Sequence, residues 1–150
     1  MIRKITLDDK QAYLDMSLKF YQSIAVIKPK KPRYLLKTLK EMISDNPYLE
    51  GYVYEINGQI AGYMLLTFTY SNEFGGEVIN IDELYIRDEF QGMGIGTQLL
   101  EFVEETYTDC QAILLMVNEE NKFAKKLYSK QGYKEIEYLQ MIKQSSDIEN

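Results

Sequence analysis

A glycine-rich segment, Gln91 to Gly96, stands between a strand-like run at 77–86 and an amphipathic helical pattern at 97–107. Glycine lets the backbone approach a ligand closely, because no Cβ atom stands in the way. The start of the following helix offers unpaired N–H groups and the positive end of the helix dipole. A strand, a glycine loop and a helix in this order therefore predict an anion site, suited to a pyrophosphate, in an α/β fold.

Two common phosphate loops do not fit this segment. It lacks the Gly-Lys-Ser/Thr ending of an NTPase P-loop. Its glycines at 92, 94 and 96 give G-x-G-x-G, whereas the dinucleotide fingerprint has G-x-G-x-x-G. Taken alone, the segment is either a generic anion site or a turn that only connects a strand to a helix.

The rest of the chain alternates short strands and helices without a repeat or a linker, so we expect one domain over residues 1–150. Asn57-Gly58 between two strand-like runs predicts a β-hairpin. The other predicted elements are strands at 2–5, 52–56, 60–70 and 112–117, helices at 8–21, 35–43 and from 123 to a cap at Gly132, and one or two closing strands within 133–142.

The chain contains no histidine. This absence excludes Ser–His and Cys–His nucleophile pairs and nearly every zinc or non-haem iron site, so we expect no bound metal. Acid–base chemistry must then use carboxylates, tyrosine, lysine or water. A formal net charge of -6 argues against a nucleic-acid partner, because phosphate neutralisation needs clustered Lys and Arg, and it favours a cationic ligand.

The sequence carries no signal-peptide pattern and no apolar stretch of the length that a membrane span needs. Its single cysteine, Cys110, cannot form an internal disulfide, which fits a reducing compartment. We therefore expect a cytoplasmic protein without a membrane partner. The sequence leaves open whether the chain forms a homodimer.

Two motifs resemble those of the GNAT acetyltransferases. Asp82-Glu83-Leu84-Tyr85-Ile86 followed by Gln91-x-x-Gly94-x-Gly96 is similar to the central motif of that family, and Asn121-x-x-Ala124-x-x-x-Tyr128-x-x-x-Gly132-Tyr133 is similar to its second signature. The resemblance covers about residues 77–133 and implies the GNAT acyl-CoA N-acyltransferase fold. That fold is an α/β architecture with a mixed, twisted sheet of about six or seven strands, helices on both faces and a central splay for the cofactor.

The resemblance also implies acetyl-CoA as the cosubstrate. Backbone groups of Leu84, Tyr85 and Ile86 would bond its pantetheine arm as an added strand, and Asn121 would contact it near the last helix. Its pyrophosphate would be held by backbone amides of Gln91, Gly92, Met93, Gly94, Ile95, Gly96 and Thr97. Gln91 stands where many relatives have arginine, so a direct charge pair with the phosphate is lost there.

By the same resemblance, Tyr128 would protonate the departing thiolate. Asp82 and Glu83 are the candidates for the base that takes the amine proton, and a water relay is the third possibility. Adjacent residues of a strand face opposite sides, so only one carboxylate should face the cleft unless a bulge intervenes. The apolar positions change parity between Ile81 and Leu84, which predicts a bulge near 80–83.

The stretch Thr69 to Gly76, followed by Ile81 to Tyr85 with its paired acids, is similar to that of the diamine and thialysine acetyltransferases. With the acidic net charge, this similarity favours a small cationic primary amine that attacks the thioester directly. Two alternatives stay open. One is a protein or peptide N-acetyltransferase, which would need an extended groove, and the other is a non-catalytic acetyl-CoA-binding sensor that keeps the fold.

Overall fold

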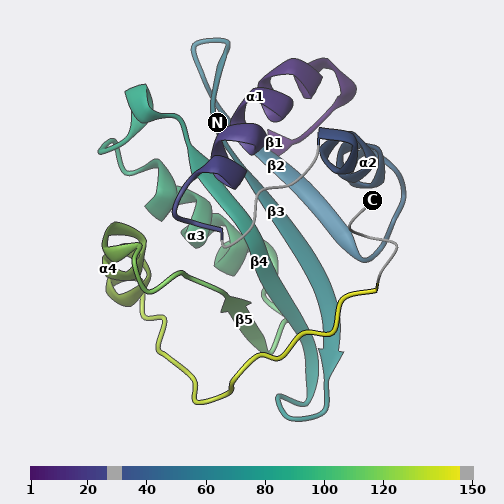
Figure 1. Cartoon of the computed structure of the whole chain (residues 1–150), viewed down its shortest axis with the longest axis vertical. Coiled ribbons are helices and arrows are strands. Elements are labelled where there is room, and N and C mark those ends of the chain that lie inside the picture. The colour runs from purple at the N-terminus through teal and green to yellow at the C-terminus, as the bar shows by residue number, and fades with distance from the viewer. Residues whose placement is uncertain (27–31, 146–150) are drawn as a thin grey trace.

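The structure, a computed structural model, describes residues 1–26 and 32–145. Its elements are β1 (Ile2–Lys4), α1 (Lys10–Gln22), α2 (Pro32–Ile43), β2 (Leu49–Ile56), β3 (Gln59–Ser71), β4 (Gly76–Ile86), α3 (Ile95–Thr106), β5 (Ala112–Leu115) and α4 (Lys122–Lys130), with 3-10 turns at Leu7–Asp9 and Asp88–Phe90 (Figure 1). The predicted alternation of strands and helices is confirmed through α4. Within the described ranges, no helix has the length and apolarity to cross a membrane.

The strands of the described residues form one mixed sheet in the order β1-β2-β3-β4-β5. The pairs from β1 to β4 are antiparallel, and β5 runs parallel to β4. In the turn between β2 and β3, Asn57 and Gly58 have φ values of 49° and 77°. A two-residue hairpin needs this left-handed backbone at both positions, which explains why Asn-Gly predicted it correctly.

Each face of the sheet carries its own apolar core. On one face, α1 and α2 pack against β2 and β3 at Val53 and Tyr63. On the other face, α3 packs against β3 and β4 at Met64 and Ile79. Figure 1 shows the same division, with α1 and α2 on one side of the sheet and α3 on the other. Helices on both faces were predicted, and this is confirmed.

A β-bulge interrupts the pairing of β3 with β4. Leu65 is paired with Glu83 and Leu66 with Ile81, so Asp82 has no counterpart on β3. The extra residue lets Ile81 and Leu84 pack on the same face of the sheet, against the core that contains α3. The bulge predicted from the parity change is confirmed.

The prediction of six or seven strands is wrong for the described residues, which form five. Residues 134–145, where closing strands were expected, form neither strand nor helix, and Leu139, Met141 and Ile142 are exposed. The segment instead runs to the β3–β4 turn, where the Tyr138 hydroxyl donates to Glu73 at 2.8 Å (Figure 1). Alternating side chains make a segment fit for a strand, but a strand also requires backbone pairing with a neighbour, which sequence periodicity does not report.

Candidate active site

The loop between β4 and α3 exposes the N-terminus of α3. Gly92 and Gly94 have φ values of 78° and 79°, a left-handed backbone that strains any residue with a Cβ atom. Gly94 is the N-cap of α3 and, having no side chain, makes no side-chain hydrogen bond to the first turn. The first N–H groups of α3 are therefore left for an external acceptor, as an anion site requires.

Gln91 supports this loop from within. Its side-chain amide donates to the Ile86 carbonyl at 3.1 Å and to the Asp88 carboxylate at 3.2 Å. The side chain that replaces the arginine of many relatives is thus hydrogen-bonded to the loop itself. The Gln91 backbone N–H also donates to the Asp88 carbonyl at 3.2 Å, so both donor groups of Gln91 are engaged within the loop.

β4 extends beyond the strand beside it. Its parallel pairing with β5 covers Val78 to Ile81 and stops there, whereas its pairing with β3 continues to Ile86. On the β5 side, the backbone of Leu84, Tyr85 and Ile86 therefore has no strand partner among the described residues. An unpaired strand edge is a site where an extended ligand can add to the sheet. The predicted splay is present at this place.

A cavity of about 670 Å³ opens beside this edge. That volume is within the usual range for a small-molecule site. Ten of the eleven predicted cofactor residues line it: Leu84, Tyr85, Ile86, Gln91, Gly92, Gly94, Ile95, Gly96, Thr97 and Asn121. The exception is Met93, which is 56% exposed and does not line the cavity.

The end of α1 forms the wall that sequence reasoning missed. Phe20 and the residues 22–25 line the cavity across from the glycine-rich loop. The Asn118 side-chain amide donates to the Ile24 carbonyl at 2.8 Å, which joins this wall to the loop between β5 and α4. The two residues are 94 positions apart, so no local pattern could have revealed the contact.

α4 supplies two of the predicted residues to the cavity. Asn121 lines it and also caps the helix, because its side-chain oxygen accepts from the Ala124 N–H at 3.2 Å. Tyr128 lines it two turns further on, with its ring packed on Tyr133 at a centroid distance of 6.0 Å. Burial raises the pKa of Tyr128, so its hydroxyl keeps its proton at neutral pH.

Glu83 lies on the same face of the sheet as α1 and is 6% exposed. Its carboxylate accepts hydrogen bonds from the Tyr63 hydroxyl at 2.7 Å and the Tyr21 hydroxyl at 2.9 Å. Burial raises the pKa of Glu83, and the two hydrogen bonds partly oppose this rise because they stabilise the charged form. Glu83 does not line the cavity, but Tyr85, two residues along the same strand face, does.

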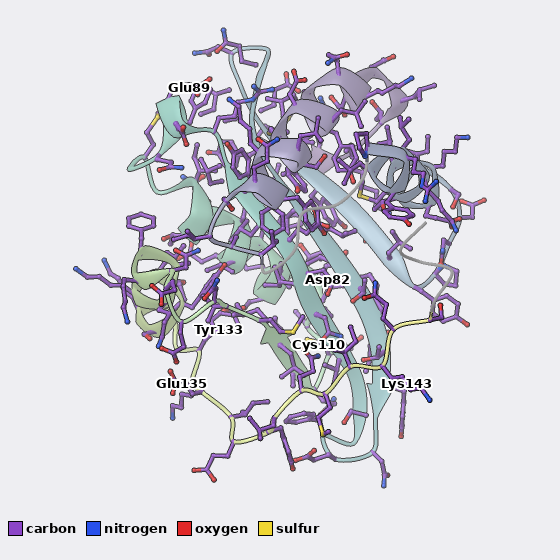
Figure 2. The ribbon with its side chains drawn as sticks, in the orientation of Figure 1. Asp82, Glu89, Cys110, Tyr133, Glu135 and Lys143 are labelled. Carbon is purple, nitrogen blue, oxygen red and sulfur yellow. The ribbon has the colours of Figure 1, made fainter. Side chains whose placement is uncertain are left out.

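Asp82 has a different environment from its neighbour. At the bulge it is exposed, and Figure 2 shows it over the middle of the sheet, away from Tyr133 below α4. The adjacent strand still removes some water from its carboxyl group, which raises the pKa of Asp82, while the nearby Thr67 side chain lowers it. The structure thus gathers Tyr128 and ten of the eleven predicted cofactor residues around one cavity, and neither carboxylate lines it. The described residues contain no cluster of acidic or cysteine side chains that could hold a metal ion.

A sequence model of the acetyltransferase (GNAT) family matches residues 11–133. The chain belongs to this family. The match includes the glycine-rich loop, both carboxylates and Tyr128, which confirms the resemblance drawn from the two motifs. The cavity-lining residues from Lys19 to Tyr128 all lie within the matched range.

Relatives and solved structures agree with this membership. The chain is 31% identical over 152 residues to an uncharacterized N-acetyltransferase of Methanocaldococcus jannaschii, a match that covers 95% of this chain and 66% of that protein. It is 33% identical over 79 residues to the thialysine N-epsilon-acetyltransferase of Bos taurus, covering 51% of this chain and 46% of that protein. An aminoglycoside N-acetyltransferase in complex with CoA has the same fold, with a TM-score of 0.79 at 15% identity over 96% of this chain and 93% of that one. The chain spans about half to two thirds of the length of the curated relatives it matches.

Proposed function

We propose that the chain is an acetyl-CoA-dependent N-acetyltransferase that acetylates a primary amine, and that the amine is small and cationic. The observation that carries this proposal is the cavity of about 670 Å³, because it joins the open N-terminus of α3, the unpaired edge of β4 and Tyr128 in one space. An anion site alone would fit many ligands. A phosphate site at α3, an unpaired strand edge at β4 and a proton donor at Tyr128, all around one cavity, fit an elongated thioester.

The residues present suit acetyl-CoA as the cosubstrate. The amides around Gly94 and Gly96 would hold the pyrophosphate, because the N-cap residue of α3 supplies no side-chain acceptor to them. The backbone of Leu84 and Tyr85 would pair with the pantetheine arm, while the Ile86 carbonyl already accepts from Gln91. When bound, acetyl-CoA supplies the activated acetyl group.

Tyr128 is the proton donor of the proposed transfer. The amine nitrogen forms a bond to the thioester carbonyl carbon, the carbon–sulfur bond breaks, and the thiolate receives the Tyr128 proton. Because burial raises the pKa of Tyr128, the donor stays protonated at the pH where the amine reacts. Backbone amides near the thioester would stabilise the negative charge that develops on the carbonyl oxygen.

Glu83 is the proposed base. An alkyl ammonium with a pKa of about 10.4 must lose a proton before its nitrogen can attack. Burial raises the pKa of Glu83, and a carboxylate with a raised pKa is a more effective base than one at its ordinary pKa. Glu83 does not line the cavity, so we propose that the proton reaches it through one water. Asp82 is the alternative base.

The cationic substrate rests on charge and on relatives. The net charge of -6 and the acids at 82 and 83 favour approach of a cation, and aromatic rings such as Tyr21 and Tyr85 offer it cation–π contacts. Relatives include thialysine N-epsilon-acetyltransferases of several mammals. We also propose that residues 1–150 act as one catalytic domain in the cytoplasm.

The test is release of free thiol from acetyl-CoA in the presence of polyamines, aminoglycosides, amino acids or peptides. Tyr128→Phe should lower kcat by about 100-fold and leave the Kd of acetyl-CoA unchanged, because it removes only the proton donor. Tyr133→Phe is the matched control, since it removes a neighbouring hydroxyl outside the cavity lining. Activity only on peptides would favour the protein N-acetyltransferase, and binding of acetyl-CoA without thiol release on any amine would favour the sensor.

A further inference from the structure

Two tyrosine hydroxyls enclose the buried carboxylate of Glu83. Tyr21 on α1 donates to Oε2 at 2.9 Å, and Tyr63 on β3 donates to Oε1 at 2.7 Å. Each carboxylate oxygen thus has its own donor, and the two donors come from opposite sides, the helix and the sheet. A buried carboxylate without such partners would be strongly unfavourable in its charged form.

Among the described residues, the groups that act on Glu83 are Tyr13 and Tyr21 from α1, Tyr63 from β3 and Asp82 from β4 itself, and none of these is a cation. Asp82 carries a like charge and disfavours ionisation of Glu83. The hydrogen bonds from the hydroxyls of Tyr21 and Tyr63 are therefore the interactions that stabilise the ionised form of Glu83.

The Tyr21 contact also connects the carboxylate to the cavity wall. Tyr21 lies in the last turn of α1, beside Phe20 and Gln22, both of which line the cavity. If the site served only to attach α1 to the sheet, an apolar residue at position 83 would do so without the penalty of burying a charge. A charged residue held by two donors at this place indicates a chemical use of the charge.

We propose that Tyr21 is a positioning residue of the acetyl transfer, and that its hydroxyl, with that of Tyr63, fixes the orientation and the charge state of the Glu83 carboxylate that receives the amine proton. This inference rests on the proposed function. In addition to forming the cavity wall, the end of α1 then controls the strength of Glu83 as a base.

The sign of the effect follows from the donors. A base must be ionised to act, so kcat/KM rises with pH through the pKa of Glu83. Hydrogen bonds from the two hydroxyls stabilise the ionised form and hold that pKa below the value that burial alone would give. Tyr21→Phe removes one of them, so the acidic limb of the pH profile should move upward.

The experiment measures kcat/KM against pH for the wild type, Tyr21→Phe, Tyr13→Phe and Glu83→Gln, with one amine throughout so that its own titration contributes equally. The acidic limb of the Tyr21→Phe profile should move to higher pH by about one unit, because the loss of a hydrogen bond to a charged group changes that group's pKa by about this amount. Below the limb, kcat/KM should fall about tenfold, and above it the rate should return to within a few-fold of wild type. Tyr13→Phe is the matched control, since it removes a buried hydroxyl whose ring centroid lies 5.4 Å from that of Tyr63, while the hydrogen bonds to Glu83 come from Tyr21 and Tyr63.

The outcomes separate the two proposals. If the acidic limb of Tyr21→Phe does not move and Glu83→Gln is inactive, the positioning role of Tyr21 is overturned and Glu83 remains the assigned base. Full activity of Glu83→Gln overturns the base assignment in the proposed function. If Tyr21→Phe unfolds, Tyr63→Phe removes the other donor, and the carbon NMR shift of the Glu83 carboxyl group gives its pKa without any turnover. An unshifted NMR titration in the folded variant refutes the inference.

Discussion

Substitution of Gly94 by alanine should separate cofactor binding from protein stability. Gly94 has a φ of 79°, and a Cβ atom built there meets no protein atom within 4 Å. The new methyl group therefore strains the backbone by about 1–2 kcal/mol without a clash inside the protein. The open space that it enters is the cavity, which Gly94 lines.

The loss of affinity can be worked from the same geometry. A methyl group at Gly94 would push a phosphate away from the N–H groups of α3, and one lost hydrogen bond to a charged group is worth about 1.5–3 kcal/mol. The Kd of acetyl-CoA should therefore rise roughly 10- to 100-fold. Isothermal titration calorimetry gives this Kd, and thermal unfolding should show a Tm lower by roughly 2–8 °C.

Gly58→Ala is the matched control. Gly58 has a φ of 77° and an equally open Cβ position, but it lies in the turn between β2 and β3 and outside the cavity lining. Both variants should lose the same stability, and only Gly94→Ala should lose affinity. Unchanged acetyl-CoA binding by Gly94→Ala, or an equal loss in both variants, would refute the placement of the phosphate at the start of α3.

Three further predictions follow from single contacts. The kcat of the wild type should fall once pH rises above the pKa of Tyr128, which burial holds above its ordinary value, and pH–rate profiles of Tyr128→Phe should lack this limb. Arg3→Ala should lower the free energy of unfolding in urea by about 2 kcal/mol at pH 7, because Arg3 bonds both oxygens of buried Asp9. Arg3 holds the pKa of Asp9 below its ordinary value. The stability lost in Arg3→Ala should therefore be fully seen above about pH 4 and should disappear as pH falls through the lowered pKa of Asp9. An equal loss of stability at low pH would contradict this prediction. Asn118→Ala should raise the KM of the amine about 5-fold without changing the Kd of acetyl-CoA, because it removes the hydrogen bond to Ile24 that holds the cavity wall, and an unchanged amine KM in steady-state kinetics would refute this.

Local features of the sequence predicted most of the fold. The hairpin at Asn57-Gly58 and the bulge at Asp82 are set by turn chemistry and by the parity of apolar residues, both of which a short window contains. The glycine-rich loop is similar, because left-handed backbone at Gly92 and Gly94 needs the residue that stands there. These features could be read before any contact in space was known.

Long-range contacts could not be predicted in this way. The hydrogen bonds of Tyr21 and Tyr63 to Glu83 span 62 and 20 positions, and nothing near either tyrosine indicates its partner. The sequence therefore suggested Glu83 as a base without revealing that it is buried. The closing strands expected within 133–142 failed for the same reason, since pairing depends on a neighbour that periodicity does not identify.

The central claim is transfer of an acetyl group from acetyl-CoA to an amine in the cavity beside β4. Its most direct test is to incubate the protein with acetyl-CoA that carries an isotope-labelled acetyl group and a panel of small diamines, and to examine the amines by mass spectrometry. We expect a labelled acetyl amide on at least one diamine with the wild type, and a much slower reaction with Tyr128→Phe. Unlabelled diamines in the presence of tightly bound acetyl-CoA would contradict it.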